Sequence, residues 1–328
     1  MGVRIGFGAA IVCAAIVLAV ATGPVVPAHA ADSALSYNEI TKVITKGSPA
    51  PGSYSNGSFD ADWAAATQKK AGGLFGMIKN AMSMMSNGIP SSLYYLNNME
   101  RNDDVKDATG TITIPAKREI IHLDYGQKTY WIATPNPAQE TMETPPPQPQ
   151  PQPQQSMAPP QPGTAKVAVT VTTTSLGSMN LGGVDTNGYQ MTFKVVSTEA
   201  TGSCKNGTFG TAMTEFVSSY PQPELRNPNP TMKPPPKMEN PLLQPGLATV
   251  GSPGCKPKVS ATVKNGPTAP SGRLVIWEML TFNLAGGATG QQAGGISTVI
   301  ERGDVKQLGS GDSGLFDIPA GFKQVAPQ

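Results

Sequence analysis

Histidine, cysteine and charge are scarce in this chain. Its 328 residues include two histidines and three cysteines, and 14% are charged, with a net charge of +2. Because His29 lies in the N-terminal apolar segment, His122 is the one histidine left for catalysis or metal binding. A near-neutral chain has no basic surface for nucleic acid, and the cysteines do not have the C-x-x-C spacing of a zinc site. We therefore expect a protein that is not an enzyme, with no catalytic residue, metal, cofactor or nucleic-acid partner.

Residues 1–30 have the pattern of a secretory signal peptide. Arg4 precedes an apolar run at 5–21, and an A-x-A cleavage box follows at 28–30. The alternative is an uncleaved anchor, since the apolar run nearly spans a bilayer. No other stretch is long and apolar enough to cross a membrane. We predict an exported protein of the periplasm or the extracellular space, with no transmembrane segment after cleavage.

Cys204 and Cys255 remain once the signal peptide, which holds Cys13, is removed. An even number of cysteines in an exported chain favours a disulfide. The bridge would close a loop of about 50 residues and contribute about 4 kcal/mol by restricting the unfolded chain. The alternative is two buried free thiols.

Segments of alternating or β-branched residues predict strands along most of the remaining chain. The clearest hairpin is 117–133, where two runs rich in Ile, Tyr and Trp flank a turn at 124–127 with a glycine suited to positive φ. The clearest single strand is 189–195, after a turn at 185–188. Further strands are predicted at 34–46, 92–99, 111–114, 167–172, 208–217, 258–263, 273–284, 296–301 and 315–318.

One or two helical pieces interrupt the strands. Asp60 or Asp62 could cap a first helix that ends near residue 70. A second piece at 74–85 would follow the Gly72-Gly73 hinge. Its apolar face approximates a helical stripe and consists of Leu74, Phe75, Ile78, Met82 and Met85. These side chains could line a pocket for an acyl chain or complete an ordinary core; copper binding by the methionines is the less favoured interpretation.

Two proline-rich tracts divide the chain. Residues 135–163 form a Pro/Gln-rich segment with little to bury, which predicts a disordered insertion that acts as a spacer or, less favoured, as a docking ligand. A second proline-rich loop spans 221–254. Since neither 31–134 nor 164–328 looks complete alone, we predict one domain with insertions.

Two short motifs suggest chemistry that the rest of the chain does not support. Residues 311–314 read Gly-Asp-Ser-Gly, as in trypsin-like proteases, but Leu315 follows where that family has glycine. His122 and Asp124 would share a strand face, yet a metal site needs further ligands that cannot be identified. A polar loop and a polar outer strand face are the favoured interpretations.

These elements predict a mainly β (α+β) fold, with a curved antiparallel sheet or half-barrel and one or two helical pieces on one face. Several segments resemble a family of exported bacterial proteins of unknown function, with the most specific match at the C-terminal LFDIPAGFKQV. The matching segments are 72–77, 95–101, 120–124, 128–130, 183–189 and 315–325. The chain departs from that family in its proline-rich insertions and in His122, where an acidic residue is usual.

The fold that the resemblance implies is similar to the periplasmic lipoprotein carriers, with a helix over a concave, apolar sheet face. We therefore expect an uncharacterised, non-enzymatic envelope protein that binds a lipid or another apolar ligand between sheet and helix. The alternative is a structural or protein-interaction module of the cell envelope, with an envelope protein as its partner.

Overall fold

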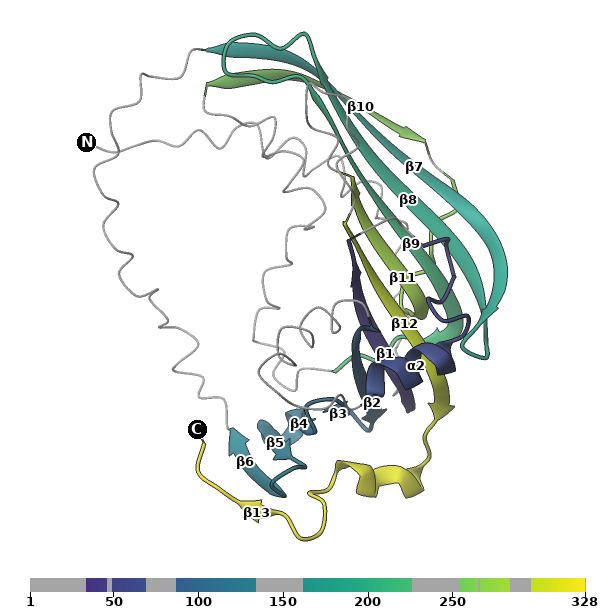
Figure 1. Cartoon of the computed structure of the whole chain (residues 1–328), viewed down its shortest axis with the longest axis vertical. Helices are drawn as coiled ribbons and strands as arrows, with labels where there is room; N and C mark the ends of the chain where they lie inside the picture. The colour runs from purple at the N-terminus through teal and green to yellow at the C-terminus, as the bar shows by residue number, and fades with distance from the viewer. Residues whose placement is uncertain are drawn as a thin grey trace, which may run out of the picture.

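The structure is a computed structural model, which describes residues 34–45, 49–68, 87–133, 162–225, 254–264, 266–283 and 296–327. Thirteen strands in these ranges form one open, curved sheet, in the order β10-β7-β8-β9-β11-β12-β1-β2-β3-β4-β5-β6-β13 (Figure 1). The strands are β1 (Leu35–Ile44), β2 (Ile89–Leu96), β3 (Met99–Asp104), β4 (Thr109–Ile114), β5 (Glu119–Asp124), β6 (Thr129–Ala133), β7 (Gly163–Leu181), β8 (Val184–Thr198), β9 (Gly207–Pro221), β10 (Cys255–Lys264), β11 (Arg273–Asn283), β12 (Ile296–Gln307) and β13 (Lys323–Gln324). The helices are α2 (Phe59–Thr67) and the short 3-10 helices η1 (Pro115–Lys117) and η2 (Ser310–Phe316).

The predicted mainly β fold with a curved, mainly antiparallel sheet is confirmed. Two of the strand pairs are parallel, β10 with β7 and β13 with β6, and both lie at the ends of the sheet. Strands from before and after residues 134–161 join the same sheet, because β1 pairs with β12 on one side and β2 on the other. None of the helices in the described ranges is long and apolar enough to cross a membrane.

The predicted hairpin at 117–133 is confirmed as β5 and β6. Asp124 begins the turn, and its Oδ1 accepts a hydrogen bond from the backbone N–H of Gln127 at 2.8 Å. The left-handed residue of the turn is Lys128, with φ of 54°, and not the glycine of the sequence-based prediction. The disulfide between Cys204 and Cys255 is also confirmed, with a Cα–Cα distance of 5.0 Å.

The sequence-based prediction misplaced two turns and one strand. The segment 92–99 contains the end of β2 and a tight turn at Asn97 and Asn98, both with positive φ, after which β3 begins. Residues 185–188 are part of β8 and not a turn, since the chain reverses at Gly182 and Gly183 instead. The predicted strand at 315–318 is wrong, because η2 occupies 310–316 and Phe316 anchors it in the core.

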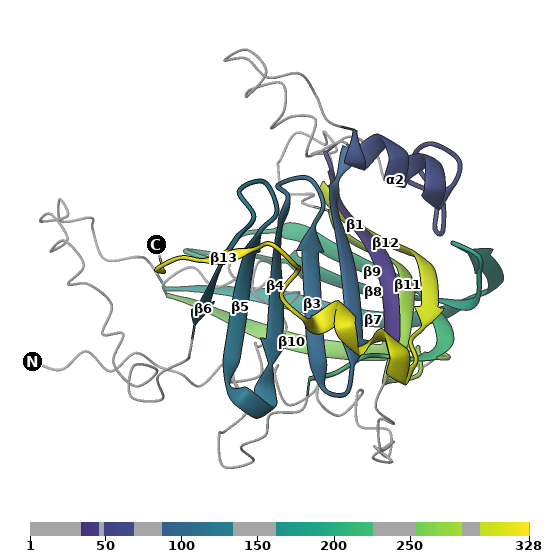
Figure 2. The same cartoon turned by 90° about the horizontal axis from the view of Figure 1, so that it is seen from below.

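The two faces of the sheet are packed differently, and cross-strand register identifies them because directly paired residues share a face. We call the face that contacts α2 and η2 the outer face, since Figures 1 and 2 show the C-terminal segment crossing β3 to β6 outside the arc of the sheet. The opposite, concave side is the inner face. Each strand contributes alternate residues to the two faces.

One part of the outer face is closed by the loop before α2. The indole Nε1 of Trp277 donates to the carbonyl of Ser53 at 3.2 Å. Gly52 lies against the Phe216 ring with φ of +72°, so this turn needs a residue without a Cβ. Ser58, and not Asp60 or Asp62, caps α2, because its Oγ accepts the Ala61 N–H at 3.2 Å.

The other part of the outer face is closed by the C-terminal segment. Phe316 of η2 packs on the buried apolar residues of β4 and β5, among them Ile112 and Leu123. Half-buried Phe322 joins the same cluster and meets the Tyr125 ring edge-on at a centroid distance of 5.8 Å. This packing explains why the C-terminal motif is rich in apolar residues.

Candidate functional site

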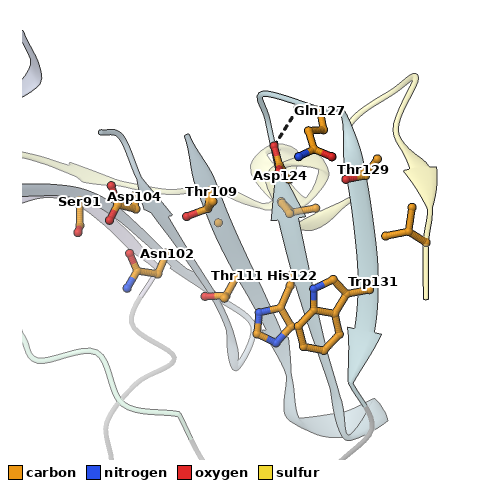
Figure 3. Close-up of a pocket in the computed structure, with 13 residues that line it drawn as sticks. Ser91, Asn102, Asp104, Thr109, Thr111, His122, Asp124, Gln127, Thr129 and Trp131 are labelled. Atoms are coloured by element: carbon orange, nitrogen blue, oxygen red, sulfur yellow. Dashed lines mark hydrogen bonds between the residues drawn. The ribbon is translucent and has the colours of Figure 1, made fainter. Parts of the chain in front are cut away.

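The inner face of β2 to β6 carries a polar pocket of about 460 Å³ (Figure 3). Hydroxyl, amide and carboxylate side chains from five neighbouring strands and from the β5–β6 turn provide most of its lining. The lining residues are Ser91, Asn102, Asp104, Thr109, Gly110, Thr111, His122, Leu123, Asp124, Gln127, Thr129, Trp131 and Val325. The register explains this set, because Ser91 pairs with Asp104, and Thr111 pairs with His122. The pocket can therefore hold a polar group against a sheet of hydrogen-bonding side chains.

His122 and Trp131 form the aromatic end of the pocket. They are directly opposite partners on β5 and β6, and their rings stack at a centroid distance of 3.8 Å with an interplanar angle of 14°. Burial lowers the pKa of the His122 imidazole, so the ring is neutral at pH 7. A neutral imidazole on an indole offers a flat surface with one donor and one acceptor.

The two carboxylates of the pocket already accept hydrogen bonds from turns. Asp104 Oδ1 accepts from the N–H groups of Lys106 and Asp107, each at 2.9 Å, and Asp124 accepts from Gln127. These bonds fix the two side chains at the rim of the pocket. No group of three or more metal-ligating side chains occurs in the described part of the chain.

An apolar patch lies on the same inner face, at the other half of the sheet. It combines buried and half-buried side chains from four strands, and its members are Val167, Val169, Phe193, Val195, Phe209 and Phe282. We call this set the inner apolar patch. Every member comes from a strand, and α2 packs instead on β1, β2 and β12 from the outer side. Within the described ranges, no helix contributes to this patch.

Charged side chains separate the patch from the pocket. Arg302 of β12 donates from Nε to Glu39 at 2.8 Å, and its guanidinium lies 5.8 Å from the centre of the Tyr37 ring. Burial raises the pKa of Glu215 and of Glu278, which pair with each other across β9 and β11. The inner face thus changes from apolar at the patch on β7, β8, β9 and β11, through a band of charged residues, to polar at β2 to β6.

The structure brings some of the sequence-predicted residues together and separates others. His122 and Asp124 share a face as predicted, but they line a pocket on the inner face and not a plain outer surface. Ser313 lies in η2, on the outer side of the sheet, so it cannot form a catalytic triad with His122. The predicted apolar pocket residues Leu74, Phe75, Ile78, Met82 and Met85 lie outside the described residues.

Sequence reasoning missed Trp131 and the inner apolar patch. A signal for the patch existed in the alternation of 189–195, which predicted one buried face, but nothing local told which strands would extend that face. Comparison with protein-family models, curated proteins and solved structures finds no match to the chain.

Proposed function

We propose that this chain is an exported, non-enzymatic binding protein that holds a lipid on the inner face of its sheet. The observation that carries the proposal is the inner apolar patch, which is built from strands alone and shares a face with a polar pocket. An amphipathic ligand matches both surfaces, because its acyl chain can cover the patch while its polar part lies toward the charged band and the pocket. On this proposal the curved sheet acts as a half-barrel.

The driving force would be burial of apolar surface, which contributes about 25 cal/mol per Å² removed from water. An acyl chain gains about 0.8 kcal/mol for each methylene that it buries. Phe193 and Phe282 would provide much of the contact area, since both rings are half-buried at the patch. The disulfide and the predicted signal peptide both fit a protein that folds outside the cytoplasm.

Native mass spectrometry of the protein purified from the envelope of its host tests the proposal. We expect a reproducible adduct with the mass of a lipid, which organic extraction removes and identifies. A ligand-free mass under conditions that preserve non-covalent complexes would contradict it. Leu74→Asp tests separately whether the 74–85 segment contributes, since the adduct would weaken in this variant if that segment covers the acyl chain.

A second candidate function is that of a protein-interaction module, and the edge strand β10 favours it. Among the described strands, β10 is the last of the sheet and pairs on one side only, with β7. Most of its side chains are exposed, and Val259 is 42% exposed. A partner could add a strand to this edge. Co-purification of a stoichiometric protein in place of a lipid, lost on Val259→Pro, would favour this function.

A further inference from the structure

Three charged side chains meet in the interior of the outer face, where α2 packs on the sheet. Lys42 of β1 is 2% exposed, Asp62 of α2 is fully buried, and Glu301 of β12 is 1% exposed. Lys42 Nζ lies 2.6 Å from Asp62 Oδ2 and 2.8 Å from each carboxylate oxygen of Glu301. A buried lysine between two buried carboxylates is an expensive arrangement as a set of ions, since one negative charge remains without a cation.

The hydrogen-bond donors around Asp62 resemble those around a carbonyl group that is activated for nucleophilic attack. Its Oδ1 accepts hydrogen bonds from the backbone N–H of Asn56 at 2.9 Å and from the Asn56 side-chain amide at 2.6 Å. Oδ2, the oxygen nearer to Lys42, accepts from the N–H of Ser55 at 2.9 Å. Fixed N–H donors of this kind stabilise the negative charge that develops on an acyl oxygen when a nucleophile attacks its carbon.

Glu301 is placed to transfer the protons that such an attack requires. Both of its oxygens contact Lys42 Nζ, and its carboxyl also interacts with that of Asp62. Burial raises the pKa of Glu301 to about 7, although the Lys42 ammonium opposes this effect. The carboxyl can therefore both accept and release a proton near neutral pH. Phe59 and Ala66 of α2 and Ile40 of β1 form an apolar cluster beside the three groups.

We propose that Lys42 and Asp62 condense spontaneously to an intramolecular amide bond, with Glu301 as the proton carrier. Glu301 takes a proton from the Lys42 ammonium and passes it to Asp62 Oδ2. The free amine attacks Cγ of Asp62, Oδ1 holds the developing charge against Asn56, and Oδ2 leaves as water after a second proton arrives through Glu301. One ammonium and one carboxylate become one amide and one water, with no change of oxidation state and no co-reactant.

The bond would tie β1 covalently to α2 and close a ring around the loop at 49–58. That loop accepts the Trp277 hydrogen bond and covers Phe216, so the bond would fix the outer core in place. The bond would involve no residue of the inner face, so it would form whether or not the protein binds a lipid there.

Peptide mapping of the full-length purified protein tests this inference. We expect a branched peptide that joins the segments around Lys42 and Asp62, with a mass deficit of one water, about 18 Da, and no tryptic cleavage after Lys42. Glu301→Gln should keep the side-chain shape and leave the two segments separate. Asp62→Asn should still form the branch but lose ammonia, about 17 Da, because an amide nitrogen then leaves in place of Oδ2.

Unlinked peptides of full mass from the folded wild-type protein, with the Cys204–Cys255 bridge intact and after prolonged incubation at neutral pH, would overturn the inference. Lys42→Arg is a second control, because arginine keeps the positive charge but cannot supply a neutral amine. A branch that persists in this variant would show that Lys42 is not the nucleophile and would overturn the inference as well. The wild-type result is decisive even if a variant fails to fold.

Discussion

Glu215 of β9 and Glu278 of β11 are directly opposite partners in the sheet, with both carboxyl side chains on the inner face. Burial raises the pKa of each carboxyl, and the Glu278 charge raises that of Glu215 further. Like charges directly across a strand pair are destabilising. Two such residues at the border of an apolar patch are therefore a cost to the fold that a binding role at this face would explain.

Glu215→Gln should stabilise the protein at pH 8. The pKa of Glu215 in the folded protein lies above its value in the unfolded chain. The contribution of this carboxyl to the stability of the folded protein is therefore full below about pH 4.3 and is lost as the pH rises through the folded pKa. The increase in the free energy of unfolding that the neutral glutamine provides should therefore shrink toward zero as the pH falls to 4. Urea unfolding at several pH values measures it, with exposed Glu224→Gln as the control that should not change. An equal gain at pH 4 and pH 8 would contradict this account.

Removal of the disulfide should destabilise the protein. Cys204→Ser with Cys255→Ser opens a loop with a sequence separation of 51 residues, and the chain-entropy model gives a loss of about 4 kcal/mol. Because Cys255 begins β10, hydrogen exchange should increase first in β10 and at the adjoining end of β7. Reduction of the wild type should reproduce the loss. Unchanged stability in the double variant would mean that the bridge adds nothing to the fold.

Phe316→Ala should remove the anchor of the C-terminal segment. The ring is 4% exposed and packs on β4 and β5, so its truncation should cost about 3–5 kcal/mol. Val105→Ala, at a side chain that is 36% exposed, should change the free energy of unfolding by less than about 0.5 kcal/mol. Denaturant unfolding compares the two. A loss below about 1 kcal/mol for Phe316→Ala would show that the C-terminal segment does not close the core.

His122 should titrate below its ordinary pKa. Its ring stacks on Trp131 and is partly desolvated, which lowers the pKa from 6.5. In NMR titrations the midpoint should rise toward 6.5 when Trp131→Ala opens the ring to water. Trp63→Ala is the matched control, since that indole stacks on Phe59 of α2 beyond the outer face. A titration midpoint above 6.5 for His122 in the wild type would mean that water fills the pocket or that a carboxylate lies close to the imidazole ring.

Local signals in the sequence account for the elements that were predicted correctly. The hairpin of β5 and β6 has an Asp-initiated turn between β-rich runs, and 189–195 alternates strictly, so both needed no distant information. The Asn97-Asn98 turn has a local signal that was missed, because asparagine tolerates the left-handed conformation that tight hairpins require. A second local signal that was missed is Gly182-Gly183. The chain reverses at these two glycines and not at the polar residues 185–188 that follow.

Non-local contacts account for what could not be predicted. Lys42 has the pattern of a surface residue in a strand, yet it is buried and its charged partners lie 20 and 259 residues away. The inner apolar patch depends on the strand order, which places β11 beside β9 although residues 222–272, including β10, separate them in sequence. Alternation along a strand shows that it has two different faces. It does not show which of them will be the inner face, because that depends on how the strands assemble.

Isothermal titration with palmitate tests the central proposal most directly, and the chain offers a matched pair of variants. Val169 belongs to the inner apolar patch, whereas its neighbour Ala168 is exposed on the opposite face of β7. We predict one-to-one binding to the wild type and to Ala168→Asp, with affinity weakened at least about tenfold in Val169→Asp, because a carboxylate there would be desolvated by the acyl chain. No binding to the wild type, or equal affinity for the two variants, would contradict a lipid site on the inner face.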